Sequence, residues 1–597
     1  MINTLWGSLL LLAPFLLIFC FTDRLKGFWY ILTADLAWHL FLSLTTQFLH
    51  IFSYPIITGL HTLTALAVIL VLIKKAKGIS FKLHLNWLAI LAFSIIIFEL
   101  WSVHYFYSGS VSNNVNRYQA VSRASYPYPY FSDEWVGVSI VKYCIANNAL
   151  PIINPLINRG GNQDFPNIFI AFFSVLSEIF LLVNLNPLTG YAIFSLASGA
   201  LICLLVYTLL RINGLRPGTA ILGALFLPYI VNSQNLTGIW YLIPIIGGLI
   251  PWLLSLGAFK FRDFRLAWIN SFLALLLYPP LIFFVLPTCA GGLLLDKKID
   301  RKMKTKLIFW GISIFAGAAA LIIFLQGSNL AIFTKLVKSY FIYPSLDNGI
   351  PFLPIWLVVP WIILPFSALG MIMAWRKKMF YLVAPLSAGL LLWLIYSRSL
   401  HLFIIGYDRT VLTSSILLTV VAALGWDYLT EKLIRRFPIL VRAFLNREIL
   451  IFTIAIFGLL SWSYTQQATW EKFTLKLDAP DGVRRIKPLA PATDFLTAAD
   501  LKLFQPLSGK RFLSDPWKGL VIGAATGNYP LDSKHSIISN QFLSFNLFMA
   551  QDCDHKKILA EEYQLEYLYA PALQCLGFYD LGTNDAGLHL YRFNKPI

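Results

Sequence analysis

Two adjacent carboxylates follow a rigid aromatic and proline-rich run in the stretch YPYPYFSDEW. A carboxylate such as Asp133 or Glu134 acts as a general base when it reaches hydrogen-bonding distance of an acceptor hydroxyl or amine. The same two acids would also lie in the first turn of a helix capped by Ser132, where negative charge complements the helix dipole. From these residues alone, the acids could serve either as a general base or as charges that complement the helix dipole.

A second cluster is the stretch SRSLHLFIIGYDRT, residues 397–410. The guanidinium of Arg409, at the first turn of the helix that follows, is suited to a bidentate contact with a phosphate. Its other roles would be to anchor the helix at the membrane interface or to pair with Asp408. Arg398 and His401, in the same stretch, would add positive charge.

Further candidates are scattered over the chain. Lys335 and Lys338 share a helical face at i, i+3 in a long loop at 333–354, which either covers a lipid-entry cavity or is mobile. Asp164 is another candidate acid of the loops. Asp35 with His39, and Glu99, fall inside apolar segments, where ionisable residues are functional unless they merely pair with each other.

Several enzyme classes lack support in the sequence. There is no HExxH, CxxC or Walker motif, so a metalloprotease, a redox enzyme and an ATPase are not indicated. The carboxylates have no diagnostic metal spacing, which leaves a bound divalent cation as an option only. GAATG, near residue 525, is a weak match to a phosphate-binding turn, and a tight turn between a strand and a helix explains it better.

Composition shows what must position these side chains. The chain has 597 residues, 58% hydrophobic and 13% charged, with a mean hydropathy of +0.68. Many apolar runs reach the roughly 20 residues that cross a bilayer. We expect a polytopic α-helical membrane protein with about 11–14 transmembrane helices. The apolar segments lie at about 5–22, 29–50, 52–73, 85–107, 190–210, 217–233, 238–260, 266–279, 281–295, 307–327, 353–375, 379–398, 410–429 and 449–468.

The net charge of +18 is distributed over short loops. Alternate loops are rich in Lys and Arg and hold about three times as many as the opposite side, which is the positive-inside pattern. This argues against nucleic acid as a partner and predicts a multi-pass protein of the cell (inner or plasma) membrane with an extracytoplasmic N-terminus. It requires the apolar segment 165–185 to be an outer interfacial helix with Glu178 on its polar side; a buried spanning helix is the alternative.

This sidedness places the outer loop 108–189 and the region 469–597 outside the cytoplasm. The latter has a water-soluble composition, with β-rich runs such as GLVIGAATGN, EYLYA and LHLYRF, and predicts a small extracytoplasmic α/β domain. Cys553 and Cys575 both lie there and would form a disulfide in an oxidising compartment.

Taken in order, these features resemble a known superfamily. SDEW in the first outer loop, the apolar helix after DFPN, the YPP break, the late YDR and the C-terminal domain look like the GT-C integral-membrane glycosyltransferases, such as protein mannosyltransferases and the aminoarabinose transferase of lipid A. The resemblance covers about 85–597, with the transmembrane domain at 85–468. The helices within 1–84 fall outside it.

The resemblance implies a mechanism and a set of partners. The donor would be a sugar on a polyprenyl (pyro)phosphate, and the acceptor a lipid, a glycan or a protein. Asp133 would deprotonate the acceptor, with Glu134 as the substitute base. Arg409 would hold the lipid phosphate, assisted by Lys335, Lys338, Arg398 or His401, because preorganised cations stabilise a departing phosphate.

The sequence also departs from the superfamily. No WWD run occurs in the C-terminal domain, which argues against an oligosaccharyltransferase that reads Asn sequons. The loop NSQNLTG, residues 232–238, holds no carboxylate where metal-dependent members place a second acidic motif, which weakens the case for a metal. A transporter or lipid-carrier flippase, depending on Asp35, His39 and Glu99, is the alternative function, and a non-catalytic scaffold is a third.

Overall fold

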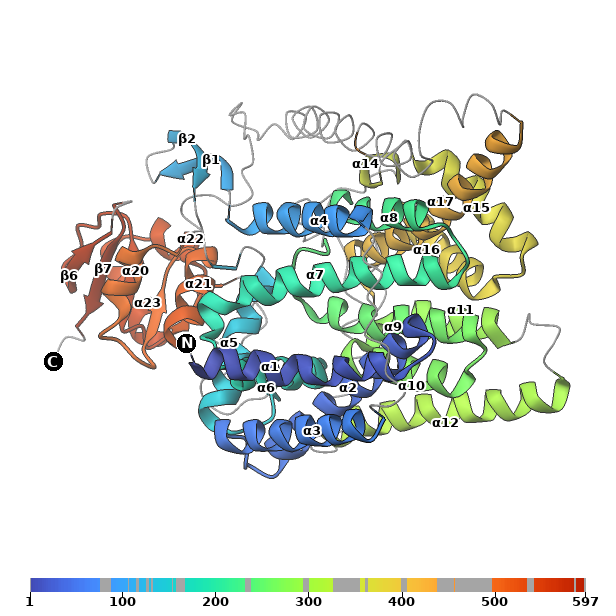
Figure 1. Cartoon of the computed structure of the whole chain (residues 1–597). Coiled ribbons are helices and arrows are strands. Elements are labelled where there is room, and N and C mark those ends of the chain that lie inside the picture. Colours follow the sequence, from blue (N-terminus) through green and yellow to red (C-terminus); the bar gives the residue numbers. More distant parts are fainter. Residues whose placement is uncertain are drawn as a thin grey trace. The chain divides into compact units, whose positions relative to one another are not determined.

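The computed structural model (Figure 1) describes most of the chain. The described residues are 2–75, 87–105, 107–113, 117–124, 128–129, 132–152, 154–156, 167–230, 238–293, 300–325, 355–359, 363–398, 405–436, 456, 496–533, 542–584 and 587–594.

The chain divides into two compact units. The first comprises Met1–Trp101, Ile168–Asn184 and Ile193–Lys476, and the second comprises Ser102–Asn167, Leu185–Ala192 and Leu477–Ile597. The predicted outer loop 108–189 is therefore divided: its part Ile168–Asn184 belongs to the first unit, and the rest belongs to the same unit as the C-terminal region.

The membrane part is built from helices, which confirms the predicted fold class. Among the described residues, six helices are long and apolar enough to cross a membrane, and five shorter apolar helices accompany them. The helical elements are α1 Ile2–Leu12, η1 Ala13–Cys20, α2 Arg24–Phe48, α3 Tyr54–Lys75, α4 Trp87–Tyr105, α6 Ile170–Val183, α7 Pro187–Ile212, α8 Pro217–Leu225, η3 Leu227–Tyr229, α9 Pro244–Phe261, α10 Phe264–Leu277, η4 Pro279–Leu281, α11 Ile282–Leu293, α12 Arg301–Leu325, α14 Ile355–Val358, α15 Leu364–Arg376, α16 Phe380–Arg398 and α17 Tyr407–Arg436.

Local sequence accounts for the ends of several of these helices. Asp23 and Asp263 precede α2 and α10, and each accepts a hydrogen bond from a backbone N–H of the first turn. The Pro279–Pro280 pair, which cannot continue a helical hydrogen-bond ladder, produces the short η4 turn between α10 and α11. The YPP break predicted from the sequence is therefore confirmed.

Small residues allow two helices of the first unit to pack closely. A Cβ added to Gly370 on α15 would lie 1.7 Å from the carbonyl oxygen of Val421 on α17. A Cβ added to Gly425 would lie 2.1 Å from the carbonyl oxygen of Phe366. Such backbone contact is the usual basis of helix association in membranes, where neighbouring lipid offers no hydrophobic drive.

The helix α6 is buried rather than interfacial. All but two of its 14 residues are buried, and it packs against α1, α2, α3, α9 and α10. At about 1.5 Å per residue it is also too short to cross a bilayer by itself. The prediction that Glu178 lies on a polar face is wrong: its side chain is fully buried, facing imidazoles of α2 and α3.

The second unit contains the predicted α/β domain. Five strands form a mixed sheet in the order β4-β3-β5-β7-β6, in which β3 pairs in parallel with β4 and β5 while β7 pairs antiparallel with β5 and β6. The elements of the unit are β1 Tyr107–Asn113, β2 Arg117–Ala124, α5 Ser132–Asn147, α20 Ala498–Phe504, β3 Arg511–Leu513, α21 Pro516–Thr526, β4 Tyr529–Pro530, α22 Phe545–Ala550, α23 Cys553–Glu562, β5 Tyr567–Ala570, β6 Phe578–Thr583 and β7 His589–Phe593.

Two of the three β-rich runs are strands and one is not. EYLYA and LHLYRF contain β5 and β7, whereas GLVIGAATGN lies mostly in the helix α21. Start and stop signals outweigh the β-propensity of this run: Asp515 accepts from the N–H of Trp517, Pro516 stands at the first position, and Gly527 ends the helix with a φ of +76°. GAATG is thus a helix C-terminus that leads into β4.

The carbonyl end of α21 accepts hydrogen bonds from a lysine of α5. Lys142 of α5 donates from Nζ to the carbonyl of Ala525 at 2.6 Å and to that of Ala524 at 3.4 Å. A cation at the negative end of a helix is stabilising. Burial lowers the pKa of Lys142. Its ammonium group binds the carbonyls at the end of α21, within the same unit.

The predicted disulfide is present. Cys553, at the start of α23, is bonded to Cys575, with Cα atoms 5.5 Å apart. The bond closes a loop next to the core of the domain, whose centre includes Phe548, Ala560 and Leu568.

A buried ion pair ties α20 and α21 together. Asp500 accepts from Lys518 Nζ at 2.5 Å, from the hydroxyl of Tyr569 at 2.5 Å and from Asn584 Nδ2 at 2.9 Å. Both charged side chains are almost fully buried. Burial opposes the charge of Asp500, but Lys518 and the hydrogen bonds outweigh it and hold the pKa of Asp500 below its usual range.

We predict that Lys518→Met destabilises the domain by about 3–5 kcal/mol, because it leaves a buried carboxylate with no cation. The measurement is the urea dependence of proteolysis of the C-terminal region in the full-length protein. Since the pKa of Asp500 is lowered in the folded state, its contribution is present above about pH 4 and disappears as the pH falls below that value.

The matched control is Lys510→Met. Lys510 pairs with Glu566 at 2.9 Å, but both side chains are more than one-third exposed. Such a pair contributes about 1 kcal/mol or less. Equal losses in the two variants would contradict the role assigned to the buried pair.

Candidate functional site

The acidic pair lies in the first turn of α5, as the sequence predicted. The two side chains differ in exposure: Asp133 is half-buried, whereas Glu134 and Ser132 are fully buried. Because a general base must reach its acceptor, Asp133 is the carboxylate of the pair that an external molecule can contact. Glu134 instead faces the interior of the second unit.

An aromatic wall supports this turn. Trp135 is buried and its ring lies 6.4 Å from that of Tyr128, in the aromatic and proline-rich run. Tyr191 is also fully buried, and the charges of Glu134 and Asp133 both act on its phenol. A Cβ added to Gly137, one turn along α5, would lie 2.2 Å from the Tyr191 hydroxyl oxygen. The absence of a side chain at Gly137 therefore lets Tyr191 approach the acidic turn.

The second predicted cluster lies in the first unit, at the start of α17. Asp408 is buried, and Arg409 donates from Nη1 to its carboxylate. The side chain of Arg409 keeps about a quarter of its surface exposed. Tyr396 donates to the carbonyl of Ile405, and its ring packs edge-on against Tyr407. These contacts fix the turn that carries Arg409.

The pairing with Asp408 does not use up the guanidinium. Arginine has five N–H donors, so a guanidinium bound to one carboxylate can still present donors to a phosphate. The backbone N–H groups of the first turn of α17 add positive potential at the same end of the helix.

Other predicted site residues cannot be placed. Asp164, Lys335, Lys338 and His401 lie outside the described residues. Arg398 is the last residue of α16, and its side chain lies outside what the structure describes. Asp133 and Glu134 belong to the second unit, and Asp408 and Arg409 to the first, so each pair is described by itself.

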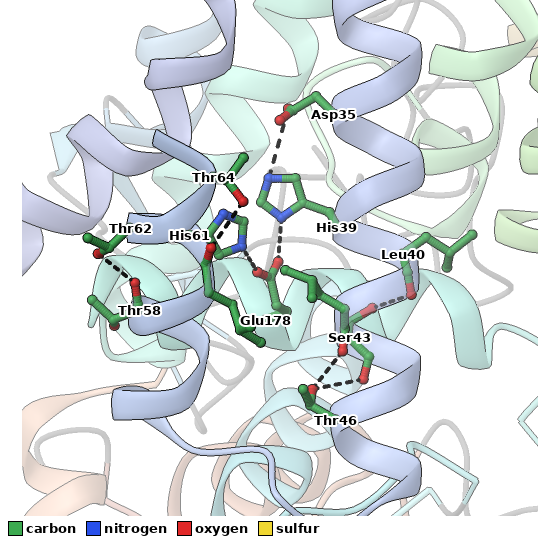
Figure 2. Close-up of polar contacts among 12 residues, drawn as sticks. Asp35, His39, Leu40, Ser43, Thr46, Thr58, His61, Thr62, Thr64 and Glu178 are labelled. Carbon is green, nitrogen blue, oxygen red and sulfur yellow. Dashed lines mark hydrogen bonds and ion pairs between the residues drawn. The ribbon is translucent and has the colours of Figure 1, made fainter. Parts of the chain in front are cut away.

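A third group was only half anticipated by the sequence (Figure 2). Glu178 of α6 accepts from Nδ1 of His39 and from Nε2 of His61, both at 2.5 Å. Asp35 lies one turn before His39 on α2, 3.8 Å from its Nε2. The sequence paired Asp35 with His39, placed Glu178 on the polar side of an interfacial helix, and missed His61. His61 and Glu178 are each a single ionisable residue in an apolar stretch. Such a residue does not reveal from the sequence which other helix its own helix contacts.

Comparison with known proteins concerns the fold. The sequence matches no family model and no curated protein at a significant level. The chain is similar to a solved structure of the Archaeoglobus fulgidus oligosaccharyltransferase tethered by a disulfide to an acceptor peptide with the NVT sequon, at 13% identity and a TM-score of 0.46, over 85% of this chain and 74% of that chain. The apo form gives 14% identity and a TM-score of 0.48, with the same coverage.

We predict that Gly137→Ala lowers the melting temperature of the full-length protein. Alanine is the better helix former, which favours it by about 1 kcal/mol, but its Cβ displaces Tyr191 at a cost of roughly 1–3 kcal/mol. Gly59→Ala on α3 is the control, because no atom lies within 4 Å of the added Cβ. A gain in stability at both positions would show that Tyr191 does not depend on Gly137.

Proposed function

We propose that this protein is a membrane glycosyltransferase that moves a sugar from a polyprenyl-phosphate-linked donor to an acceptor at the extracytoplasmic face. The observation that carries the proposal is the accessible Asp133 in the first turn of α5, beside the buried Glu134 and Tyr191. A carboxylate fixed by its neighbours in this way is preorganised to take a proton.

The reaction is a displacement at the anomeric carbon of the sugar. The acceptor hydroxyl or amine gives its proton to Asp133 and forms the new bond to that carbon. The bond between the carbon and the phosphate oxygen breaks, and the lipid phosphate leaves with the electron pair. A cation at the phosphate stabilises this departing charge.

Arg409 is our candidate for that cation. The side chain of Arg409 is about a quarter exposed, a guanidinium and the positive end of α17 both suit a phosphate, and the buried Asp408 accepts from Nη1 of Arg409. Lys335, Lys338, Arg398 and His401 stay secondary candidates for the same charge. The acceptor class is open among lipid, glycan and protein.

The location of the reaction follows from charge and cysteine chemistry. Basic loops on one side indicate that the outer loop and the C-terminal domain lie outside the cytoplasm. The Cys553–Cys575 disulfide supports this assignment, since such bonds persist in oxidising compartments. We place the protein in the cell membrane with both its N-terminus and its C-terminal domain outside.

A second candidate function is a transporter or lipid-carrier flippase. It is favoured by the buried group of Asp35, His39, His61 and Glu178, because ionisable residues inside a membrane often line a transport path. In that case Glu178, and not Asp133, would carry the activity.

We predict that Asp133→Asn lowers sugar transfer by about 10²–10⁴-fold, the usual contribution of a general base. A total lipid extract of the source cells supplies the donors and acceptors, and mass spectrometry follows loss of the sugar from polyprenyl phosphate. Glu134→Gln is the neighbouring control, with transfer reduced far less in the folded fraction because Glu134 is buried. A fully active Asp133→Asn protein, together with an inactive Glu178→Gln protein, would favour the transporter.

We predict that polyprenyl phosphate binds the wild-type protein saturably and that Arg409→Ala weakens binding by about 10–100-fold, the value of a charged hydrogen bond. Native mass spectrometry measures the binding. Arg409→Lys keeps the positive charge but loses the bidentate guanidinium donors, so its affinity should lie between those of the wild type and Arg409→Ala. Arg216→Ala is the matched control: Arg216 also precedes a helix and pairs with an aspartate, Asp427, at 2.7 Å. Equal binding by wild type and Arg409→Ala would remove Arg409 from the mechanism.

A further inference from the structure

The group of four ionisable residues in the first unit has an unusual charge balance. Two carboxylates, Asp35 and Glu178, are nearly or fully buried among apolar helices. In the described part of the chain their ion pairs are with His39 and His61 alone. Two buried negative charges need two positive ones, and neutral imidazoles supply none. Protonated histidines, a protonated carboxyl group or a divalent cation can each balance these charges.

The geometry favours a cation. One atom from each of His39, His61 and Glu178 can serve as a ligand, and these atoms all lie within 4.8 Å of one another. In Figure 2 the Glu178 carboxylate stands between the two imidazoles, whose nitrogens point at it. Nitrogen and oxygen ligands of a tetrahedral zinc ion lie about 3.3 Å apart, from bonds of about 2.0–2.1 Å. Opening the two contacts of 2.5 Å by about 1 Å would therefore admit the ion.

A second observation points the same way. Nε2 of His39 is buried and has no hydrogen-bond partner, while Asp35 Oδ2 lies 3.8 Å from it. Histidines that bind a metal through one nitrogen usually donate from the other to a carboxylate, which orients the ring. When Nδ1 of His39 binds a metal, a small movement of the ring would let Nε2–H donate to the carboxylate of Asp35.

We propose that His39, His61 and Glu178 bind one zinc-class divalent ion, with Asp35 orienting His39. The two carboxylates and two neutral imidazoles then form an electrically neutral site with the ion. The second oxygen of Glu178 or a water fills the fourth position. Because the ligands come from α2, α3 and α6, the ion joins the N-terminal helices to α6. This site shares no residue with the transferase proposal and does not depend on it.

The test is the zinc content of the full-length protein, purified through a tag without histidine, incubated with Zn²⁺ and desalted. We expect about one equivalent in the wild type by elemental mass spectrometry, and loss in His61→Ala and Glu178→Gln. His555→Ala is the matched control, because His555 pairs with Asp552 at 2.9 Å on the surface and should leave the zinc content unchanged.

Two further measurements keep the test valid if a ligand variant fails to fold. Asp35→Asn retains all three ligands and should weaken zinc binding by about 10–100-fold. Co²⁺ in place of zinc should give the visible absorption of a tetrahedral nitrogen and oxygen site in the wild type. A wild-type protein that retains no zinc, or zinc that is retained equally in folded His61→Ala, would overturn the proposal.

Discussion

The pairing of buried charged side chains within the protein is the constraint on which the structure depends. The first unit consists of apolar helices, and water is not available there to solvate a charge or a backbone group. Glu178 is acceptable in the middle of α6 only because His39 and His61 reach it from two other helices. The packing of α2, α3 and α6 is thus specified at one point by hydrogen bonds, while the surrounding contacts are apolar.

The same constraint acts in the second unit with different residues. Asp500 and Lys518 neutralise each other in the core of the C-terminal domain, and Lys142 satisfies carbonyls at the end of α21. The latter contact fastens α5, with its acidic first turn, to the C-terminal domain. Residues far apart in the sequence therefore pack together in the unit that contains Asp133. A site built this way can hold a carboxylate in place although the carboxylate itself stays accessible.

The acidic pair also illustrates why neighbouring residues with the same chemistry differ in accessibility. Asp133 and Glu134 occupy successive positions on a helix, so their side chains point about 100° apart. One is directed to the interior beside Tyr191 and the other to the periphery. Gly137 contributes by leaving room for the Tyr191 hydroxyl. The two acids have the same chemistry, and they differ in the structure because Glu134 is buried and Asp133 is not.

The sequence by itself determined the class of protein: hydropathy and loop charge are properties of single segments, and they sufficed to predict a polytopic helical fold, the YPP break and a separate α/β region. The disulfide also followed from two cysteines in one predicted domain. GLVIGAATGN has the composition of a strand, but the local start and stop signals around it, Asp515, Pro516 and Gly527, make it a helix. Local signals failed for α6, which has the composition of an interfacial helix but is enclosed by five other helices. Only the tertiary structure decided that Glu178 meets His39 and His61, and that Glu134 is buried while Asp133 is not. The physical reason is that the pairing and burial of a side chain depend on which helices are in contact. The periodic pattern along one helix predicts which of its faces is apolar, but it does not identify the helix that packs against that face.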